Sequence, residues 1–246
     1  MQKEMIVADM GGTHMRFALL KNHKVSDFIE KNTPKTKEKI LSLLSGEIKE
    51  LIDKNGKMKI GIACAGVIDK DVIRVSPNLP LKNFNIKEYI ENKFKADVKI
   101  ENDANCVALA EAKFGVRKKN FFILTLGTGI GGGIIIDGKL YKGLGSGGEL
   151  GHIILNKGKD FEYHFKRAKS NIEKMSQVAG QGIASLISVF DPEVVVISGG
   201  FTNLGNPFLS KIKNQAKKYN FLHRMPEIKF SEIENPGLIG AGLLFD

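Results

Sequence analysis

The chain has 246 residues, of which 42% are hydrophobic and 26% are charged, and these values exclude wholesale disorder. Lys and Arg outnumber Asp and Glu by 37 to 27, which gives a net charge of +10. The lysines are scattered along the chain, whereas nucleic-acid-binding proteins usually gather basic residues on one face or in one tract. We therefore expect no nucleic-acid partner, although the positive field would attract anions such as nucleotides.

The cysteine count and the apolar runs limit the compartment and the class of protein. Cys64 and Cys106 are too few for a disulfide scaffold or a four-cysteine zinc site. Their apolar neighbours indicate buried, reduced thiols, and the N-terminus has no signal-peptide core, so we expect a cytoplasmic protein. No apolar run reaches the roughly 18 residues of a spanning helix, and we expect no membrane association.

Predicted strands and helices alternate along the first part of the chain. Apolar residues at Ile40, Leu44, Ile48 and Leu51 have helical spacing, and Gly56 stands where that helix would end. MIVAD and KIGIACAG are short apolar runs typical of buried strands. We expect strands at 5–9, 15–20, 59–66 and 98–103, and helices at 35–56, 85–94 and 104–115.

The pattern then restarts with a strand, a glycine turn and a strand. Each part of the chain thus begins with a β-hairpin whose turn is rich in glycine, which is a weak internal repeat in topology. Strands that alternate with helices after each hairpin predict mixed α/β sheets. We expect strands at 120–127, 133–137, 192–200 and 228–230, and helices at 176–190, 209–219 and 237–245.

The first glycine turn, Asp9-Met-Gly-Gly-Thr13, places an acid at the end of a strand. Glycine lets the backbone approach a ligand closely, and successive N–H groups can cradle a phosphate. The acid can hold Mg²⁺ directly or through water. The same residues can also form a plain hairpin turn, so this turn alone does not decide between a structural and a binding role.

A second loop, Gly127-Thr-Gly-Ile-Gly-Gly-Gly133, contains more glycine than a turn requires. It is not a Rossmann fingerprint, because a strand follows it, and not a P-loop, because no Gly-Lys-Ser/Thr follows. Ser198-Gly199-Gly200 supplies a third turn after an apolar strand, at the carboxyl end where α/β sheets bind ligands. Glycine hairpins of this kind can hold the phosphate chain of a nucleotide.

The three loops, in this order, resemble the phosphate-1, phosphate-2 and adenosine motifs of the sugar-kinase/actin/heat-shock ATPase superfamily. Further motifs make the chain similar to the ROK family of sugar kinases and sugar-responsive repressors, over nearly its whole length. The motifs are DMGGT at 9–13, GIACAGVID at 61–69, SPNLP at 76–80, END at 101–103, LGTGIGGG at 126–133, GGELGH at 147–152, DPEVVVISGG at 191–200 and GLIGAG at 237–242.

The resemblance implies an α/β, two-lobed actin-like ATPase fold, in which each lobe is a ribonuclease-H-like mixed β-sheet flanked by helices. We expect an N-terminal lobe at 1–117 and a C-terminal lobe at 118–246, with the final helix, 237–246, packing back toward the N-terminal lobe. ATP and Mg²⁺ are the implied cofactors, the implied partners are ATP and a small sugar, and a homodimer remains open.

By this resemblance, the ATP-binding residues lie in the three glycine loops, and Asp9 is the Mg²⁺ ligand. The implied ATP-binding residues are Asp9, Gly11, Gly12, Thr13, Gly127, Thr128, Gly129, Gly131, Gly132, Gly199 and Gly200.

The candidate catalytic residues, Asn102 and Asp103, follow a predicted strand and open a helix. Both residue types favour the N-cap, which is one interpretation of the pair. A carboxylate at a strand end can equally accept a proton from a hydroxyl group. The resemblance implies that Asp103 is the general base and that Asn102 binds a sugar hydroxyl.

Four further residues fall at positions that bind the sugar in relatives: Gly66, Asn78, Glu149 and His152. Polar acceptors suit a sugar, because each hydroxyl both donates and accepts a hydrogen bond. The alternatives are ordinary turns for the first two, and a surface turn with an incidental acid and a satisfied histidine for the others.

The chain departs from the family after His152. The Cys-rich zinc loop of many relatives is missing, a Lys-rich segment takes its place, and the stretch before residue 176 is short. No cysteine follows Cys106, and His152 with His164 offers at most two zinc ligands, so we expect no structural zinc. Glu162 resembles the sugar-facing acid that closes this loop; the alternative is one more charge on a Lys-rich surface helix. His14 stands where relatives often have Lys, and we assign it no role.

The implied function is that of an ATP-dependent hexose kinase of the glucokinase type. N-acetylmannosamine, N-acetylglucosamine and fructose are the alternative substrates, because the motifs indicate a hydroxylated ring without its identity. A repressor of this family would need a helix-turn-helix domain ahead of the first strand, for which a start at Met5 leaves no room. A non-catalytic sugar-binding or regulatory protein is a further alternative, against which Asp9, Asp103 and the glycine loops argue.

Overall fold

The computed structural model describes residues 4–56 and 59–246. Its contacts divide the chain into two compact units. The first unit comprises Met1–Ala110, Gly143–Ser146 and Ile233–Asp246, and the second comprises Glu111–Lys142 and Gly147–Glu232. The change of unit falls between Ala110 and Glu111, inside helix α3 (Asp103–Lys113), a few residues before the expected boundary at 117.

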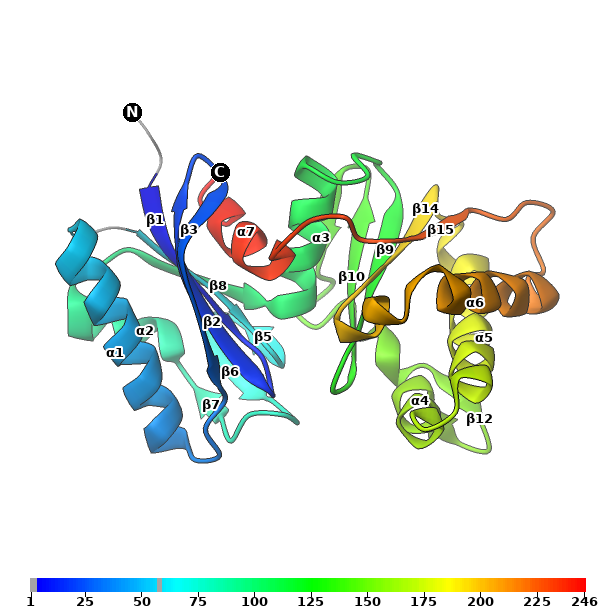
Figure 1. Cartoon of the computed structure of the whole chain (residues 1–246), viewed down its shortest axis with the longest axis horizontal. Coiled ribbons are helices and arrows are strands. Elements are labelled where there is room, and N and C mark those ends of the chain that lie inside the picture. The colour runs from blue at the N-terminus through cyan, green and yellow to red at the C-terminus, as the bar shows by residue number, and fades with distance from the viewer. Residues whose placement is uncertain (1–3, 57–58) are drawn as a thin grey trace. The chain divides into compact units, whose positions relative to one another are not determined.

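The first unit is built on a five-stranded sheet of order β3-β2-β1-β4-β8 (Figure 1). β1 and β2 form the expected antiparallel hairpin, and β1, β4 and β8 run parallel to one another. The strands, in sheet order, are β3 (Lys24–Asn32), β2 (His14–Lys21), β1 (Glu4–Met10), β4 (Lys59–Cys64) and β8 (Val98–Asn102).

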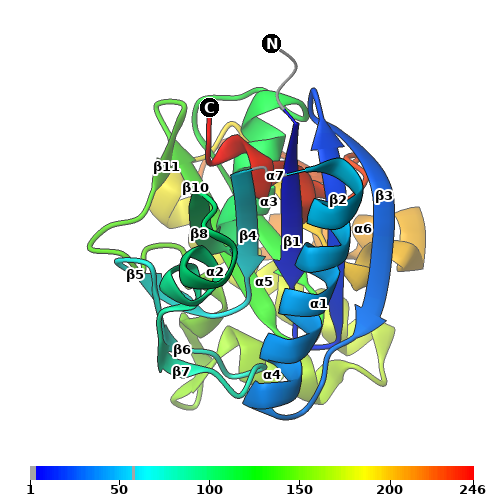
Figure 2. The same cartoon turned by 90° about the vertical axis from the view of Figure 1, so that its left-hand side faces the viewer.

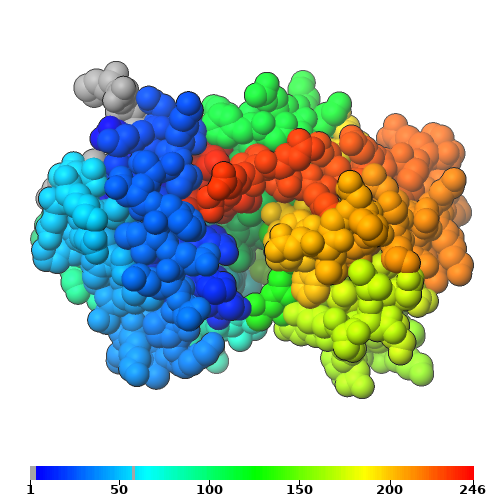
Figure 3. Space-filling model, viewed as in Figure 1, coloured from blue at the N-terminus to red at the C-terminus, as the bar shows by residue number. Residues whose placement is uncertain are grey.

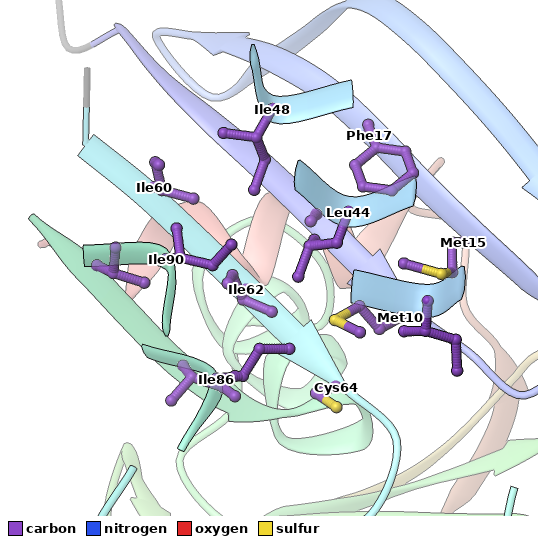
Figure 4. Packing of buried hydrophobic residues seen from close by; sticks show 14 of the residues in the cluster. Met10, Met15, Phe17, Leu44, Ile48, Ile60, Ile62, Cys64, Ile86 and Ile90 are labelled. Atoms are coloured by element: carbon purple, nitrogen blue, oxygen red, sulfur yellow. The ribbon is translucent and has the colours of Figure 1, made fainter. Parts of the chain in front are cut away.

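Helices α1 (Lys37–Asn55) and α2 (Ile86–Phe94) cover one face of this sheet (Figure 2). Ile40, Leu44, Ile48 and Leu51 of α1 are fully buried, as their spacing predicts. Figure 4 shows Leu44 and Ile48 directed toward Phe17, Met15 and Ile62 of the sheet. The predicted cap is confirmed as well, because Gly56 ends α1 with a φ of +85°.

The opposite face of the sheet packs against α3 and α7 (Pro236–Leu243). Met5, Val7, Ala18 and Ala63 of the strands meet Cys106, Leu238 and Ala241 of the helices. A side chain on Gly240 would collide with the backbone of Cys106, so glycine permits the close approach of α7 to α3. The final helix thus belongs to the core of the first unit.

Edge strand β3 was not expected from the sequence. It is largely exposed, it has charged residues on both faces, and a positive φ of 49° at Asp27 accompanies an irregular register against β2. The alternation that marks a half-buried strand is therefore missing. The surface of β3 and α1, in blue, is visible in Figure 3. A small sheet of β5 (Val67–Asp69), β6 (Val72–Val75) and β7 (Lys82–Phe84) was not expected either.

The second unit repeats this plan with a sheet of order β11-β10-β9-β14-β15. β9 and β10 form the second hairpin, and β9, β14 and β15 are parallel, so the predicted repeat in topology is confirmed. The strands are β11 (Lys139–Tyr141), β10 (Ile130–Ile136), β9 (Phe121–Leu126), β14 (Val194–Ser198) and β15 (Glu227–Phe230).

Helices α4 (Phe161–Ala168), α5 (Ile172–Phe190) and α6 (Gly205–Tyr219) share a core with this sheet. α5 begins four residues before the expected start at 176, because Asn171 caps it by accepting the N–H of Lys174 at 3.0 Å. Ser176 lies inside the helix, where its hydroxyl donates to the carbonyl of Ile172. α6 also begins earlier than the expected 209, since Pro207 is tolerated in a first helical turn.

Short elements connect this sheet to its helices. They are the 3₁₀ turns Leu150–His152 and Gly200–Leu204 and the hairpin of β12 (Ile154–Asn156) and β13 (Lys159–Asp160). Within 4–56 and 59–246, no helix combines the length and the apolar character needed to cross a bilayer.

Candidate active site

Three parallel strands of the first unit end at one edge of its sheet. Met10, Cys64 and Asn102 are register partners across β1, β4 and β8. Ligands of α/β sheets bind at the carboxyl ends of the strands. The turn at 11–13, Gly66 and Asp103 follow these three ends directly, so the fold brings the predicted phosphate-1 turn, sugar loop and general base to one edge.

The phosphate-1 turn is held by residues outside it. Gly11 N–H donates to the carbonyl of His14 at 3.0 Å and closes the turn. Thr33, which is buried, donates its hydroxyl to the Gly11 carbonyl at 2.6 Å and its N–H to the Thr13 carbonyl at 2.9 Å. The motifs gave no signal for Thr33, because it lies far from the turn in sequence. The Gly11 N–H is therefore used within the turn itself.

The predicted sugar loops pack against this turn. A Cβ on Gly12 would lie 2.5 Å from Cβ of Asn78, so the loop at 76–80 sits directly over the glycine. Ser76 anchors that loop by donating its hydroxyl to the Ala65 carbonyl at 2.7 Å. Gly66 has a φ of +127°, and a side chain there would meet the Val75 carbonyl. Asn78 therefore lies beside the predicted phosphate turn, and Gly66 packs against the strand that leads into the Asn78 loop.

Asp9 occupies the end of β1 as a largely enclosed carboxylate. Burial raises its pKa, and the nearby Arg16 guanidinium opposes this rise. The Arg16 Nη1 lies 3.7 Å from Asp9 Oδ2, while Arg16 Nε binds Glu30 at 2.6 Å. Gly237, at the start of α7, packs against the same carboxylate, since a Cβ there would lie 2.7 Å from Oδ2. The acid is thus confined between β2 and α7.

Of the predicted catalytic pair, Asn102 caps helix α3. Asn102 Oδ1 accepts the N–H of Asn105 at 3.0 Å, which is the capping bond of α3, and its Nδ2 donates to the Gly66 carbonyl at 3.0 Å. Asp103 Oδ1 accepts the N–H of Ala104 at 2.9 Å. Buried Glu101 supports the pair by accepting from Asn102 N–H and from the Asn105 side chain. The side chain of Asp103 is therefore not needed to cap the helix.

In the second unit, the phosphate-2 and adenosine turns lie at corresponding strand ends. Thr125 of β9 and Ser198 of β14 are register partners, so Gly127 and Gly199 follow adjacent strands. Gly199 has a φ of +93°, and a Cβ there would lie 2.5 Å from the Leu126 carbonyl. A Cβ on Gly200 or Gly127 would meet nothing within 4 Å. These two glycines leave open space beside the backbone.

The phosphate-2 loop proper is short, and two side chains from the α4 region hold it. Gly127 N–H donates to the Gly129 carbonyl at 3.0 Å. Glu162 Oε2 accepts the Ile130 N–H at 2.6 Å, and Lys169 Nζ donates to the carbonyls of Gly127 at 2.8 Å and Thr128 at 3.1 Å. Partial burial lowers the pKa of Lys169, and the neighbouring Lys166 acts in the same direction. Lys169 was not found from the sequence, because nothing distinguishes it from the other lysines of its segment.

Gly131 and Gly132, predicted to bind ATP, lie within β10 and pair with Thr125 and Leu124 of β9. A side chain on Gly132 would collide with Gly148 and Leu150, so this glycine lets the GGELGH segment pack on the strand. Packing of this segment on β10 is therefore sufficient to require a glycine at position 132.

Within the same segment, Glu149 precedes the 3₁₀ turn Leu150–His152 and His152 is its last residue. Burial raises the pKa of Glu149, and the His152 ring partly offsets the rise. His152 Nδ1 lies 2.9 Å from Asp160 Oδ2, and this hydrogen bond raises the pKa of His152. Glu162, the third predicted sugar ligand of this unit, has its carboxylate between Ile130 N–H and Lys166 Nζ, at 2.6 and 2.5 Å. In this arrangement Glu162 contacts the phosphate-2 loop.

Known proteins share both the sequence and the fold of this chain. The glucokinase of Halalkalibacterium halodurans is 28% identical, over 96% of this chain and 93% of that protein. The crystal structure of a ROK family glucokinase from Streptomyces griseus, in complex with glucose and AMPPNP, matches with a TM-score of 0.87, 23% identity and 98% coverage of both chains. The ROK hexokinase of Thermus thermophilus matches with a TM-score of 0.78 and 26% identity, over 98% of this chain and 97% of that one.

These matches confirm the predicted fold class, a mixed α/β fold of the actin-like ATPase type. The sequence model described as "ROK family" matches residues 5–164 and 158–246, which together span nearly the whole chain. The resemblance inferred from the glycine loops and the sugar motifs is confirmed, and the chain belongs to the ROK family.

Proposed function

We propose that this protein is an ATP-dependent sugar kinase, which transfers the γ-phosphate of ATP to a hydroxyl of a hexose. The observation that carries the proposal is the convergence of the Asp9 turn, Gly66 and Asp103 at the carboxyl ends of β1, β4 and β8. Phosphoryl transfer to an alcohol requires a group that holds the phosphates and a carboxylate close enough to accept the hydroxyl proton. Relatives that are glucokinases support the same activity.

In the proposed reaction, Asp103 accepts the proton of the sugar hydroxyl as its oxygen attacks the γ-phosphorus. The new sugar O–P bond forms, the bond between the γ-phosphorus and the β–γ bridging oxygen breaks, and ADP leaves. Because Asn102 caps α3, the Asp103 carboxylate can serve this role without weakening the helix. Asn102, Asn78, Gly66, Glu149 and His152 are the proposed sugar-binding residues. Glu162 remains a predicted sugar ligand, although its carboxylate here contacts Ile130.

ATP is assigned to the three glycine turns, with Gly12, Thr13 and Gly127–Gly129 facing phosphates and Gly199–Gly200 facing adenosine. Gly11, Gly131 and Gly132 belong to the same ATP-binding loops. Their proposed role is to maintain the backbone conformation of those loops. The open space beside Gly127 and Gly200 supports close approach of a ligand.

Mg²⁺ fits the enclosed carboxylate of Asp9 at the strand end, because Mg²⁺ is commonly held by one or two carboxylates together with substrate phosphates and water. Among the residues that the structure describes, no cluster of three His, Cys, Asp or Glu side chains could hold a metal. When bound, Mg²⁺ would neutralise charge on the β- and γ-phosphates. A cytoplasmic location and a homodimer remain proposals.

The two compact units are proposed to be the two lobes of the kinase. Helix α7, at 236–243, belongs to the first of them. The boundary between the compact units lies at 110/111, a few residues before the lobe boundary that the sequence predicts at 117/118.

The test is ADP release from ATP and Mg²⁺ with a panel of glucose, mannose, fructose, N-acetylglucosamine and N-acetylmannosamine. We expect at least one hexose to stimulate release, and phosphorylated sugar to form in equal amount. Asp103→Asn is the matched control, since it keeps the side chain's shape and removes its proton acceptor. Sugar binding without phosphate transfer to any of the five would favour a non-catalytic or regulatory protein instead.

A further inference from the structure

The hairpin that follows His152 returns the chain to that residue. β12 and β13 pair Ile154 with Asp160, and the turn between them uses Lys157 and Gly158, both at positive φ. Phe161 N–H then donates to the Ile153 carbonyl at 2.9 Å. The hairpin therefore places Asp160, eight residues along the chain, beside the imidazole of His152.

The two oxygens of Asp160 make two different contacts. Oδ1 accepts the N–H of Tyr163 at 2.7 Å and caps α4. Oδ2 lies 2.9 Å from His152 Nδ1. Phe161 and Phe165, on the first two turns of α4, are fully buried in the core of the second unit. The carboxylate is thus fixed by a helix that the core holds in place.

A carboxylate on one ring nitrogen decides what the other nitrogen can do. With a proton on Nδ1, Nε2 of the neutral ring is a hydrogen-bond acceptor, and Nε2 of the charged ring is a donor. In the described part of the chain, the ring of His152 makes its one hydrogen bond through Nδ1, and about half of the side chain is exposed. The contact at Nδ1 therefore fixes one ring nitrogen and leaves Nε2 to bind a ligand.

We propose that Asp160 is the positioning residue of His152, and that it fixes the proton on Nδ1 so that Nε2 addresses a sugar hydroxyl. The proposal rests on the proposed function, because it takes His152 as a sugar ligand. Many relatives have a Cys-rich loop in this region. In this chain, a short hairpin and the carboxylate of Asp160 take its place.

The charges around the ring agree with this role. The hydrogen bond that Asp160 accepts raises the pKa of His152, partial burial opposes the rise, and the carboxylates of Glu162 and Glu149 add to it. Partial burial acts to raise the pKa of Asp160, but the contacts with His152 and Tyr163 N–H, helped by Lys166, lower it overall. Each partner therefore favours the charged form of the other, and sugar binding should depend on pH through His152.

Asp160→Asn and Asp160→Ser test the proposal, because Asn and Ser cap helices about as well as Asp. An Asn amide that donates to Nδ1 would move the ring proton to Nε2, and Ser is too short to reach the ring. We expect both variants to fold with nearly unchanged melting temperature. The KM for sugar should rise about tenfold, as when a residue that orients a ligating histidine is lost, while the KM for ATP changes little.

Protein-detected NMR of the His152 ring gives a readout that does not require activity. The pKa of His152 should fall in Asp160→Asn, and D-glucose, added as the probe, should perturb the ring in the wild type more than in the variant. His164→Gln is the matched control, since it removes the contact of Nε2 with the Asn156 carbonyl in the same hairpin and leaves Asp160 in place.

The outcomes separate this inference from the proposed function. An active kinase in which Asp160→Asn keeps the wild-type KM for sugar and the wild-type titration of His152 would show that Asp160 only caps α4. A wild-type protein that neither phosphorylates nor binds any sugar of the panel would overturn the proposed function, and the sugar role of the pair with it. Equal loss in His164→Gln would indicate a general effect of the hairpin and would also overturn the inference.

Discussion

The carboxylate of Glu162 accepts a hydrogen bond of 2.6 Å from the backbone N–H of Ile130, so a side chain of α4 holds the phosphate-2 loop. Its other oxygen pairs with Lys166 at 2.5 Å. A side chain on Gly129 would collide with the same carboxylate, which means that loop and acid are in close contact. The geometry links Glu162 to the predicted phosphate-2 loop, whereas the family resemblance implies a sugar-facing role.

Two substitutions at this residue distinguish these interpretations. Glu162→Gln keeps an acceptor for Ile130 N–H, and Glu162→Ala removes it. We expect the KM for ATP to rise about tenfold in the Ala variant, because an unsatisfied N–H costs about 1–3 kcal/mol, and to change little in the Gln variant. Steady-state kinetics with each substrate varied in turn measure this. A rise confined to the KM for sugar in both variants would instead establish the sugar-facing role.

Lys169 supports the other side of the same loop by donating to the carbonyls of Gly127 and Thr128. Lys169→Met keeps much of the aliphatic stem and removes the charge and both hydrogen bonds. We expect the KM for ATP to rise roughly fivefold, for a net loss of about 1 kcal/mol. Lys217→Met, on an exposed position of α6, is the control for loss of one positive charge. Equal effects of the two substitutions would mean that Lys169 acts on ATP only through the overall positive charge of the protein.

The sequence predicted the parts of the fold that depend on local patterns. The two glycine hairpins, α1 with its glycine cap, and the parallel strands after them follow from apolar runs and turn residues. Contacts between distant segments gave no such signal. Thr33 ties the turn at 11–13, and Glu101 supports Asn102, but neither residue type nor spacing marks them in the sequence. The contact between His152 and Asp160 depends on a tight turn, in a segment that is shorter here than in the family.

Asp103 and Asn102 provide a pair of substitutions that separates catalysis from stability. Asp103→Asn should lower kcat by about 10²–10⁴-fold, which is the usual contribution of one general base, with little change in melting temperature. Asn102→Ala should lower the free energy of unfolding by about 0.5–2 kcal/mol, because it removes the cap of α3. Thermal melts and turnover are measured for both. An Asp103→Asn enzyme that keeps more than about a tenth of its turnover would exclude the base assignment.

The glycines of the predicted nucleotide turns differ in the space available to a side chain. Substitutions by alanine can therefore separate an effect on ATP binding from an effect on folding. Gly200→Ala and Gly127→Ala introduce a methyl group into open space, so both should fold normally and raise the KM for ATP. Gly199→Ala should destabilise the fold, because its φ of +93° and the Leu126 carbonyl leave no room for a Cβ. Unchanged ATP kinetics in the first two variants would mean that adenosine and phosphates do not approach these glycines.

The largely enclosed carboxylate of Asp9 should lower the free energy of unfolding at neutral pH. Burial raises its pKa above the ordinary value of 3.8, so the folded state disfavours its charge despite Arg16. An acid with a raised pKa in the folded state costs stability at a pH above that raised pKa. The cost disappears as the pH falls below the pKa of the unfolded chain.

Asp9→Asn should therefore have a higher melting temperature than the wild type at pH 7, and the difference should shrink toward zero near pH 3. The same substitution should sharply weaken activity with ATP and Mg²⁺, since it removes the proposed magnesium ligand. Glu30→Gln is the control, because Glu30 is exposed, contacts the same Arg16, and has its pKa lowered by that arginine. Its melting temperature should not rise at pH 7. If Asp9→Asn melts below the wild type at pH 7, the ion pair with Arg16 outweighs the cost of burying the carboxylate, and Asp9 stabilises the first unit.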